Sequence, residues 1–561
     1  MKFEEFKYGL PTKNFIIKKG NFLIEKLKNA SSFEEANKAF KSFEKYKSKI
    51  YTLFTNVSVH FTLDVRNETY VKNNDKMNEL SPICAEINTR FNEILVKSKF
   101  RKELEEKYGS YLFKMLELSL KTFKPEIMED IVKEGNLVNE YTKTMSSLTI
   151  EYKGKKYSLS MAGKFLESLD REERKTVGKA IHEKVLEVKD KVEDIYDQLV
   201  ILRDGMAKKL GFKNYVELGY ANMGRTDYTS KEVALYRQQI LESVTPLCKK
   251  LERARRKRIG ISSPYFYDNA ITYKDGNPKV KGEEKVLVAE AEKMYKKLSK
   301  DTGEFFVFLQ ENHLLDLTAR EGKSGGGYMT YFPDYQCPFI FSNFNGTSGD
   351  VDVLTHEFGH AFQAYCSKKI KPSAYQSPTM ESCEIHSMSM EFLAYPYMDA
   401  FFDNSKKYRF AHLTDAIMFL PYGVAVDEFQ HFVYENPNCG VKARDEKWLE
   451  IQKKYQPYLS NKGSELLESG ARWIRQHHIF QSPFYYIDYT LAQVCAFQFF
   501  NWDVKNHEKT WKRYVKLCKL GGKYPFQELI NKVHLKNPFV SGTVKKTIRP
   551  LVKYLKENTI D

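Results

Sequence analysis

The sequence predicts a mainly α-helical protein built in two lobes, with small β-hairpins. Apolar residues recur at spacings of three and four along most of the chain, for example over 33–54 and 173–210. Two segments, 148–160 and 325–346, break this pattern with alternating or aromatic-rich runs joined by turn residues. The helical pattern therefore dominates, and each exception is expected to form a hairpin.

The length of 561 residues suits two to four average domains, or one large body with an appended lobe. The periodic segment 173–210 has no clear breaker before Gly211, so a boundary has to be drawn within it. We predict an N-terminal helical lobe over 1–195, which includes the first hairpin. The remaining body, 196–561, carries the histidine motif described below.

The composition is typical of a folded globular protein, with 42% hydrophobic and 29% charged residues. The start, MKFEEFKYGL, has acids among its first residues and lacks the apolar segment of a signal peptide. No stretch approaches the roughly 18 apolar residues that cross a bilayer. The eight cysteines are scattered and form no CxxC pair, which indicates reduced thiols. We therefore expect a cytoplasmic protein with no membrane partner.

The net charge of +16 raises the alternative of a nucleic-acid binder. However, the charge is spread along the chain. The one dense basic run, RARRKR at 253–258, lies on a helical pattern and is interpreted as a solvated helix face. Because no nucleic-acid-binding motif accompanies it, we do not expect a nucleic-acid partner.

The segment LTHEFGH at 354–360 carries two histidines four residues apart. Ser348 is expected to cap a helix that begins at the next residue, so His356 and His360 project from one helical face. This spacing allows both imidazoles to bind one tetrahedral zinc ion. Glu357 lies one step round the helix, where it can act as a general base on a water molecule. The alternative is a helix with two buried, hydrogen-bonded histidines.

A third metal ligand is expected on a second helix. Metzincins continue as HxxGxxH from the second histidine, but Gln363 and Cys366 occupy those positions here, which excludes that class. The segment MESCEIHSMSMEF at 380–392 instead presents three acids at spacings of three and seven, on one helical face: Glu381, Glu384 and Glu391. Any of these carboxylates could complete the site, and a solvated acidic face is the alternative.

HEFGH followed by EIHSMSMEF resembles the oligoendopeptidase F and thimet oligopeptidase family of zinc metallopeptidases. The likeness extends over most of residues 145–540. SGGGYMTYF at 324–332 resembles the substrate-binding edge strand of that family, and RQHHIFQSPFYYIDYTLAQ at 475–493 resembles the aromatic segment that faces the zinc. The resemblance implies a large helical, two-lobed, zincin-type metallopeptidase with a deep internal substrate channel and a catalytic domain over 196–561.

The resemblance also implies roles for individual residues. The glutamate that opens the family's pattern corresponds to Glu384, which becomes the expected third ligand. Glu391 becomes the acid that orients a ligand from behind. Glu381 lies outside the pattern and is kept only as a reserve ligand. The glycine-rich edge strand implies substrate contacts by three residues: Gly326, Gly327 and Tyr328.

The aromatic segment supplies the expected donors to the oxyanion that forms when a peptide carbonyl is attacked. His478 is favoured over His477 because the family pattern reads HIF. Tyr486 and Tyr489 are three apart, whereas Tyr485 and Tyr489 are four apart, so either pair could share a face. The choice among the three tyrosines stays open at this point.

Together these features predict a zinc-dependent endopeptidase that hydrolyses internal bonds of short peptides. We expect one zinc ion per chain, and a monomer or a small homo-oligomer. The alternative function is a zinc-containing peptide-binding module without turnover. Glu357 argues against that alternative, because a closed structural zinc site needs no base.

Overall fold

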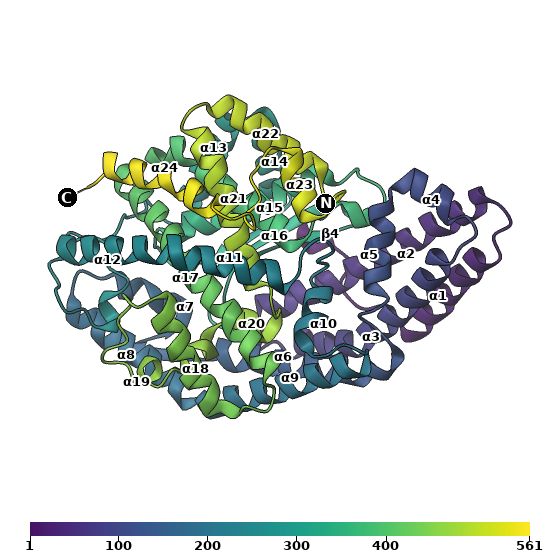
Figure 1. Cartoon of the computed structure of the whole chain (residues 1–561), viewed down its shortest axis with the longest axis horizontal. Helices are drawn as coiled ribbons and strands as arrows, with labels where there is room; N and C mark the ends of the chain where they lie inside the picture. The colour runs from purple at the N-terminus through teal and green to yellow at the C-terminus, as the bar shows by residue number, and fades with distance from the viewer. Residues whose placement is uncertain (561) are drawn as a thin grey trace.

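The computed structural model describes residues 1–560 and is mainly helical (Figure 1). Its first five long helices lie together at one side of the molecule, drawn in purple and blue in Figure 1. Their apolar stripes close on one another and form a separate hydrophobic core, in which the Phe43 and Phe91 rings stack 3.7 Å apart. These helices are α1 (Lys13–Lys28), α2 (Phe33–Leu63), α3 (Glu68–Val96), α4 (Arg101–Tyr108) and α5 (Ser110–Ser119).

A second and larger hydrophobic core has buried members from Phe3 to Leu555, and two small clusters lie apart from it, one around Ile150 and Ile181 and one around Phe266 and Leu467. The outer helices that surround it are α6 (Met128–Ser146), α7 (Leu159–Ala162), α8 (Arg171–Glu187), α9 (Lys189–Lys209), α10 (Tyr215–Asn222), α11 (Ser230–Ser243), α12 (Thr245–Ile259), α13 (Glu284–Leu298), α14 (Lys300–Glu311), α18 (Gly440–Tyr455), α19 (Glu465–Glu468), α22 (His507–Leu520), α23 (Phe526–Lys532) and α24 (Thr543–Glu557). The inner helices are α15 (Gly349–Ser367), α16 (Met380–Leu393), α17 (Ser405–Glu435), α20 (His477–Gln481) and α21 (Tyr486–Asp503).

The periodic segment 173–210 is two helices rather than one. α8 ends before Val188, whose φ of −109° and ψ of 4° interrupt the helix, and α9 begins at the next residue. No glycine or proline marks this break. The two helices pack on different partners, α8 on β1 and α9 on α6, which accounts for a turn that the helical pattern alone does not predict. Since α9 runs without interruption across residue 195, the domain boundary there stays a prediction.

Both predicted hairpins are present. β1 (Thr149–Tyr152) and β2 (Lys155–Ser158) pair antiparallel around Lys153 and Gly154, which both have positive φ as a tight two-residue turn requires. β4 (Tyr328–Phe332) and β5 (Cys337–Phe344) form the second hairpin, but β3 (Leu315–Thr318) adds a parallel strand that the sequence pattern did not indicate. The order β3-β5-β4 makes β4 an edge strand.

Three central helices lie near this sheet, and their labels lie together in the middle of Figure 1: α16 packs between α15 and α21, and α15 packs against β5 and β4. Gly359 of α15 permits the closest approach: a Cβ there would lie 2.7 Å from the backbone of α16 at His386 and Ser387. Because no side chain separates the two helices at this point, residues of α15 and α16 on either side of Gly359 are brought within direct contact.

The start of α15 differs from the prediction. Ser348 has helical φ and ψ and makes no side-chain cap. Instead Asp350 turns back, and its carboxylate accepts hydrogen bonds from the backbone N–H groups of Asn345 and Gly346. The acid therefore fixes the loop between β5 and α15, which sets where the histidine motif begins.

The basic run at 253–258 is only in part the predicted solvated face: Arg253 and Lys257 are exposed, whereas Arg255 and Arg258 make contacts that the prediction did not include. Arg255 donates to the carbonyls of Asp268 and Ile271, and Arg258 donates to that of Thr272. These arginines tie α12 to the loop that follows it, so they are committed to the fold. Separately, no helix within residues 1–560 has the length and apolar character needed to cross a membrane.

Candidate metal centre and active site

His356 and His360 of α15 converge with Glu384 of α16. Their ligand atoms all lie within 4.8 Å of one another. Glu384 Oε2 is 3.1 Å from His356 Nε2 and 3.3 Å from His360 Nε2. Burial opposes the ionisation of Glu384, but the two histidines outweigh it and hold the pKa of this carboxyl well below its ordinary value. Two imidazoles and one carboxylate form a donor set typical of catalytic zinc.

Glu391, two turns further along α16, supports this cluster from behind. Its Oε1 accepts a hydrogen bond of 2.6 Å from His356 Nδ1, which leaves Nε2 of that ring free to serve as a ligand. Its Oε2 accepts one of 2.9 Å from His412 Nε2. Burial opposes the protonation of His412, but Asp352 and Glu391 raise its pKa to about 9, so this histidine is a cation that holds Glu391 ionised.

Glu357 lies beside the cluster without joining it. The residue is 5% exposed, and its Oε2 has no hydrogen-bond partner among the described residues. Burial raises the pKa of its carboxyl, and the neighbouring His356 and His360 oppose that effect. A buried, unpartnered carboxylate oxygen beside a metal donor set is free to bind a water molecule and accept its proton.

The glycine-rich segment before β4 runs next to this carboxylate. A Cβ on Gly327 would come 3.6 Å from Glu357 Oε1 and 3.0 Å from Val353, so the position leaves room for little more than glycine. Gly326 has φ +87° and its carbonyl accepts from Asn343 Nδ2. Tyr328 uses its side chain for the fold: its hydroxyl lies 2.6 Å from Thr62 Oγ1 and its ring stacks on Phe341.

His478 of α20 lies beside Tyr485, the tyrosine whose hydroxyl contacts Glu384 of the cluster. Gln476 Nε2 donates to His478 Nδ1 at 2.8 Å, while Gln476 Oε1 accepts from the Tyr422 hydroxyl. With the Gln476 amide in this orientation, Nδ1 of His478 is the acceptor, and the neutral ring then carries its proton on Nε2. Burial and the adjacent His477 lower the pKa of His478 to about 4, which keeps the ring neutral near pH 7. Its Nε2 is 3.4 Å from the Tyr489 hydroxyl.

The three candidate tyrosines occupy different positions around His478. Tyr485 donates a hydrogen bond to Glu384 Oε1. Tyr489 packs against Tyr485 with ring centroids 4.8 Å apart and directs its hydroxyl toward His478. Tyr486 packs edge-on against Phe419 and Tyr422. Tyr489 is thus the tyrosine whose hydroxyl accompanies His478 Nε2.

Glu381 is not part of the cluster. Both of its oxygens are buried and unpartnered within the described part of the chain. Burial and the charge of Asp488 raise the pKa of its carboxyl, which Arg225 only partly opposes. Arg225 is itself committed to Asp488, at 2.6 Å.

Sequence reasoning missed the supporting residues His412, Tyr422 and Gln476. His412 and Tyr422 lie on α17, 31 residues long, where nothing in the spacing separates them from packing residues. Gln476 immediately precedes the histidine pair, and that adjacency was the only available signal.

A helical body built around an HExxH helix and an acidic partner helix defines a class, the metallopeptidases. Within that class, the chain belongs to the family described as Peptidase family M3, which matches residues 164–547. Residues 3–123 match its Peptidase M3 N-terminal domain.

Individual relatives agree with this family. A solved structure described as PZ peptidase A with inhibitor 2 is 44% identical, covers 99% of each chain and superposes with a TM-score of 0.98. A candidate oligoendopeptidase F from Bacillus anthracis is 41% identical over 100% of this chain and 99% of its own, with a TM-score of 0.94. Oligopeptidase PepF of Bacillus subtilis is 23% identical over 383 residues, 65% of this chain and 54% of its own length. The chain thus matches about half the length of that curated relative.

Proposed function

We propose that this protein is a zinc-dependent endopeptidase that cleaves internal bonds of short peptides. One observation carries the proposal: the unpartnered oxygen of Glu357 lies beside the convergent His356, His360 and Glu384. A binding module would need the metal donors but not a free buried base. The names of the matched family and of its relatives agree with peptide hydrolysis.

Zinc fits the donor set. Two neutral imidazole nitrogens and one carboxylate oxygen are its usual ligands in hydrolases, with room for a further group. His356, His360 and Glu384 would hold the ion, and Glu391 would keep His356 in the required tautomer. When bound, zinc supplies Lewis acidity toward the water and the peptide carbonyl.

Glu357 performs the proton transfers in this proposal. Its free Oε2 accepts a proton from the attacking water and later delivers that proton to the departing amine. The charge that develops on the carbonyl oxygen is met from the opposite wall. His478 donates through Nε2–H, and the nearby Tyr489 hydroxyl is positioned to donate as well. Tyr485 holds Glu384, and Tyr486 packs behind the pair.

The substrate is proposed to lie extended along β4, whose outer edge pairs with no strand in the described chain. Its backbone would pair with Gly326, Gly327 and Tyr328, so affinity would depend little on side chains. Access would be restricted, because the His356 and His360 side chains are only 18% and 13% exposed. That restriction favours short, flexible peptides, reached through an internal channel, over folded proteins.

The test is Glu357→Gln, which keeps the size of the side chain and removes the base. Zinc content should remain at the wild-type level, while turnover of a peptide of about ten residues should fall at least about a hundredfold. Metal analysis and mass spectrometry of the products measure the two quantities on the same sample. Near-normal turnover by a zinc-loaded variant would rule out Glu357 as the base.

The alternative, a peptide-binding module, makes a different prediction for the unmodified protein. Such a module would hold zinc and bind peptides without releasing any product. Incubation of the zinc-loaded protein with a panel of peptides of graded length separates the two functions directly.

A further inference from the structure

The open edge of β4 can be traced residue by residue from its pairing with β5. Met329 lies opposite Ile340, and Tyr331 lies opposite Pro338. Ile340 donates its N–H to the carbonyl of Leu314, next to β3, and Pro338 has no N–H to donate. Opposed residues of an antiparallel pair alternate between those that exchange two hydrogen bonds and those that exchange none. Met329 and Tyr331 therefore direct their backbone N–H and C=O groups to the open edge.

This edge leads from the metal cluster to a pocket. A Cβ on Gly327, two residues before Met329, would come 3.6 Å from Glu357 Oε1. Tyr331 lies four residues beyond Gly327, about 13 Å along an extended strand, and it lines a pocket of about 440 Å³. By the same alternation the Tyr328 backbone faces β5, so within β4 the contacts fall to Met329 and Tyr331 rather than to Tyr328. A peptide that follows the open edge away from Glu357 arrives at this pocket.

The pocket lies where the N-terminal helices meet the body. Figure 1 shows β4 on the side of the body next to the N-terminal helices, and α2 packs against it. Helices α2 and α3 form one wall of the pocket, and the end of β4 with the segment that joins α15 to α16 forms the other. The wall is rich in aromatic and apolar residues, which include Tyr46, Ile50, Tyr51, Phe54, Cys84, Ala85 and Tyr331.

An aromatic or large aliphatic side chain fits the chemistry of this wall. Its only charged lining residue, Lys47, is paired with Glu44 at 2.9 Å, so no free charge from the described residues lines the pocket. Burial raises the pKa of the Cys84 thiol to about 12, so the sulfur is a neutral neighbour near pH 7. The Tyr51 side chain is 56% exposed. It therefore offers an aromatic ring that the described chain leaves largely uncovered.

We propose that this pocket binds a large apolar side chain of the peptide substrate, about five residues before the cleaved bond. Antiparallel pairing is the more stable arrangement, and in it the peptide runs from Tyr331 toward Gly327. The residue opposite Gly327 adjoins the cleaved bond beside Glu357, so the residues opposite Met329 and Tyr331 are about the third and the fifth before it. Opposed residues share a face of the sheet. The inference rests on the proposed peptidase function and adds a preference far from the metal.

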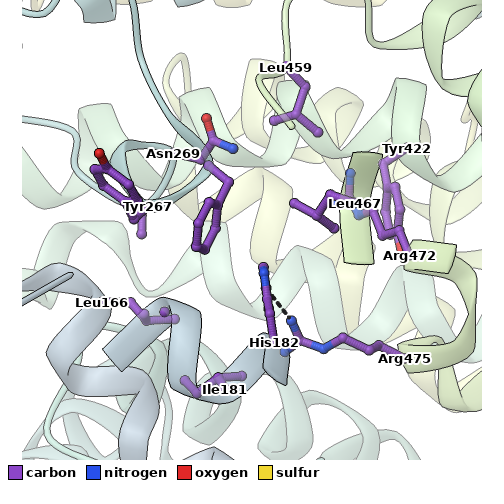
Figure 2. Close-up of a pocket in the computed structure, with 13 residues that line it drawn as sticks. Leu166, Ile181, His182, Tyr267, Asn269, Tyr422, Leu459, Leu467, Arg472 and Arg475 are labelled. Atoms are coloured by element: carbon purple, nitrogen blue, oxygen red, sulfur yellow. Dashed lines mark hydrogen bonds between the residues drawn. The ribbon is translucent and has the colours of Figure 1, made fainter. Parts of the chain in front are cut away.

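The cavity drawn in Figure 2 lacks this connection. It has a volume of about 390 Å³ and lies between α8, η4 (Phe266–Asp268) and η7 (Ala471–Arg475). None of its lining residues belongs to β4 or to the metal cluster. Leu459, which Figure 2 shows on its wall, therefore serves as a control position.

Three peptides of one sequence test the proposal, and mass spectrometry identifies the bond cleaved in each. The first has phenylalanine about five residues before the cleaved bond, the second has alanine there, and the third has its phenylalanine about five residues after the bond. For the wild-type enzyme, kcat/KM should favour the first peptide over the other two by about 10–100-fold, the ratio that burial of one aromatic side chain produces. This ratio should fall toward one in Tyr51→Ala, and Tyr51→Phe should keep most of it. Ser48→Trp, which fills the pocket from α2, should abolish the preference.

Phe22→Ala and Leu459→Ala are the matched controls. Phe22 is 50% exposed on α1, close to the exposure of Tyr51, but it does not line the pocket. Both controls should leave the ratio unchanged, and zinc content with a thermal melt reports whether each variant is folded. Equal wild-type rates on the first two peptides would overturn the proposal, as would a preference for the third. A ratio that survives both Tyr51→Ala and Ser48→Trp would also overturn it.

Binding separates this proposal from the proposed function. The dissociation constants of the first two peptides are measured with zinc-loaded Glu357→Gln, with and without Tyr51→Ala. Tighter binding of the phenylalanine peptide that disappears with the Tyr51 ring supports the pocket, even if the wild-type protein releases no product. Turnover of both peptides with equal binding would instead support the peptidase and refute the pocket.

Discussion

Two regions of the same helix, α16, treat the same residue type in opposite ways. Glu384 and Glu391 face the histidines, and those partners hold the pKa of each carboxyl below its ordinary value despite burial. Glu381, one turn earlier, is just as buried, but it meets Asp488 and has no hydrogen-bond partner in the described chain. Its pKa is raised.

The difference shows that a shared helical face does not give three carboxylates a shared role. All three satisfy the spacing rule, but the helix that lies opposite each turn decides its chemistry. α15 supplies imidazoles to Glu384 and Glu391, whereas the first turn of α16 faces the Arg225–Asp488 pair. Substitution of each acid in turn tests this division.

The largest effect is expected at Glu384. Glu384→Ala removes one of three metal donors and leaves His356 and His360 without the carboxylate between them. Zinc affinity should fall by more than about a hundredfold, beyond the range of supporting residues, and turnover should be lost. Equilibrium dialysis with zinc measures the affinity. Retention of zinc at the wild-type level would remove Glu384 from the site.

An intermediate effect is expected at Glu391. Glu391→Ala leaves the three donors but frees His356 Nδ1 and strands the His412 cation. The zinc affinity of Glu391→Ala should fall about 10–100-fold. The zinc affinity of Glu391→Gln should fall less, because glutamine keeps an acceptor oxygen. Parallel titrations of both variants check the order. An unchanged affinity in Glu391→Ala would show that His356 does not need this acceptor.

The smallest effect on the metal is expected at Glu381. Glu381→Gln should leave zinc affinity within about twofold, because this side chain lies outside the donor cluster. It should change the pH dependence of stability instead. Loss of zinc in this variant would mean that Glu381, not Glu384, completes the site.

The sign of that pH dependence follows from the raised pKa. The folded protein keeps the Glu381 proton after the unfolded chain has released it, so this group's contribution to stability is complete below pH 4.5 and is lost as pH rises above it. Glu381→Gln removes the loss. Urea denaturation at pH 5.5 and pH 8 measures the free energy of unfolding of both proteins. Between these two pH values, the variant should gain stability relative to the wild type by on the order of 1 kcal/mol.

Much of the architecture could be predicted because its signals are local. Helical periodicity and two turn sequences indicated the helices and both hairpins, and the family resemblance is confirmed by the match over 164–547. Three of the differences depend on contacts with other elements: the break at Val188, the parallel pairing of β3 with β5, and the hydrogen bonds of Arg255 and Arg258 to the loop after α12. The start of α15 is a local exception, because Asp350 rather than Ser348 accepts the backbone hydrogen bonds there.

The residues of the candidate site also differ in how far the sequence could indicate them. His356, His360 and Glu357 share one turn of helix, so their spacing was visible in the sequence, whereas the choice among Glu381, Glu384 and Glu391 needed the family resemblance. Nothing local could indicate the roles of His412 and Gln476, which depend on the packing of α17 beside α16 and beside the segment that leads into α20. The assigned roles of the site residues stay predictions until the substitutions are made.

The glycine inside HEFGH, Gly359, sets how closely α15 and α16 approach each other at the site. The α15 and α16 backbones are in direct contact at Gly359. The distance between the two helices, and with it the distance between the histidines and Glu384, is therefore set by the absence of a side chain at this position. To make the site accept a larger ion, a protein engineer would therefore leave the three donors alone and insert a methyl group at this contact, so that the two helices are wedged apart.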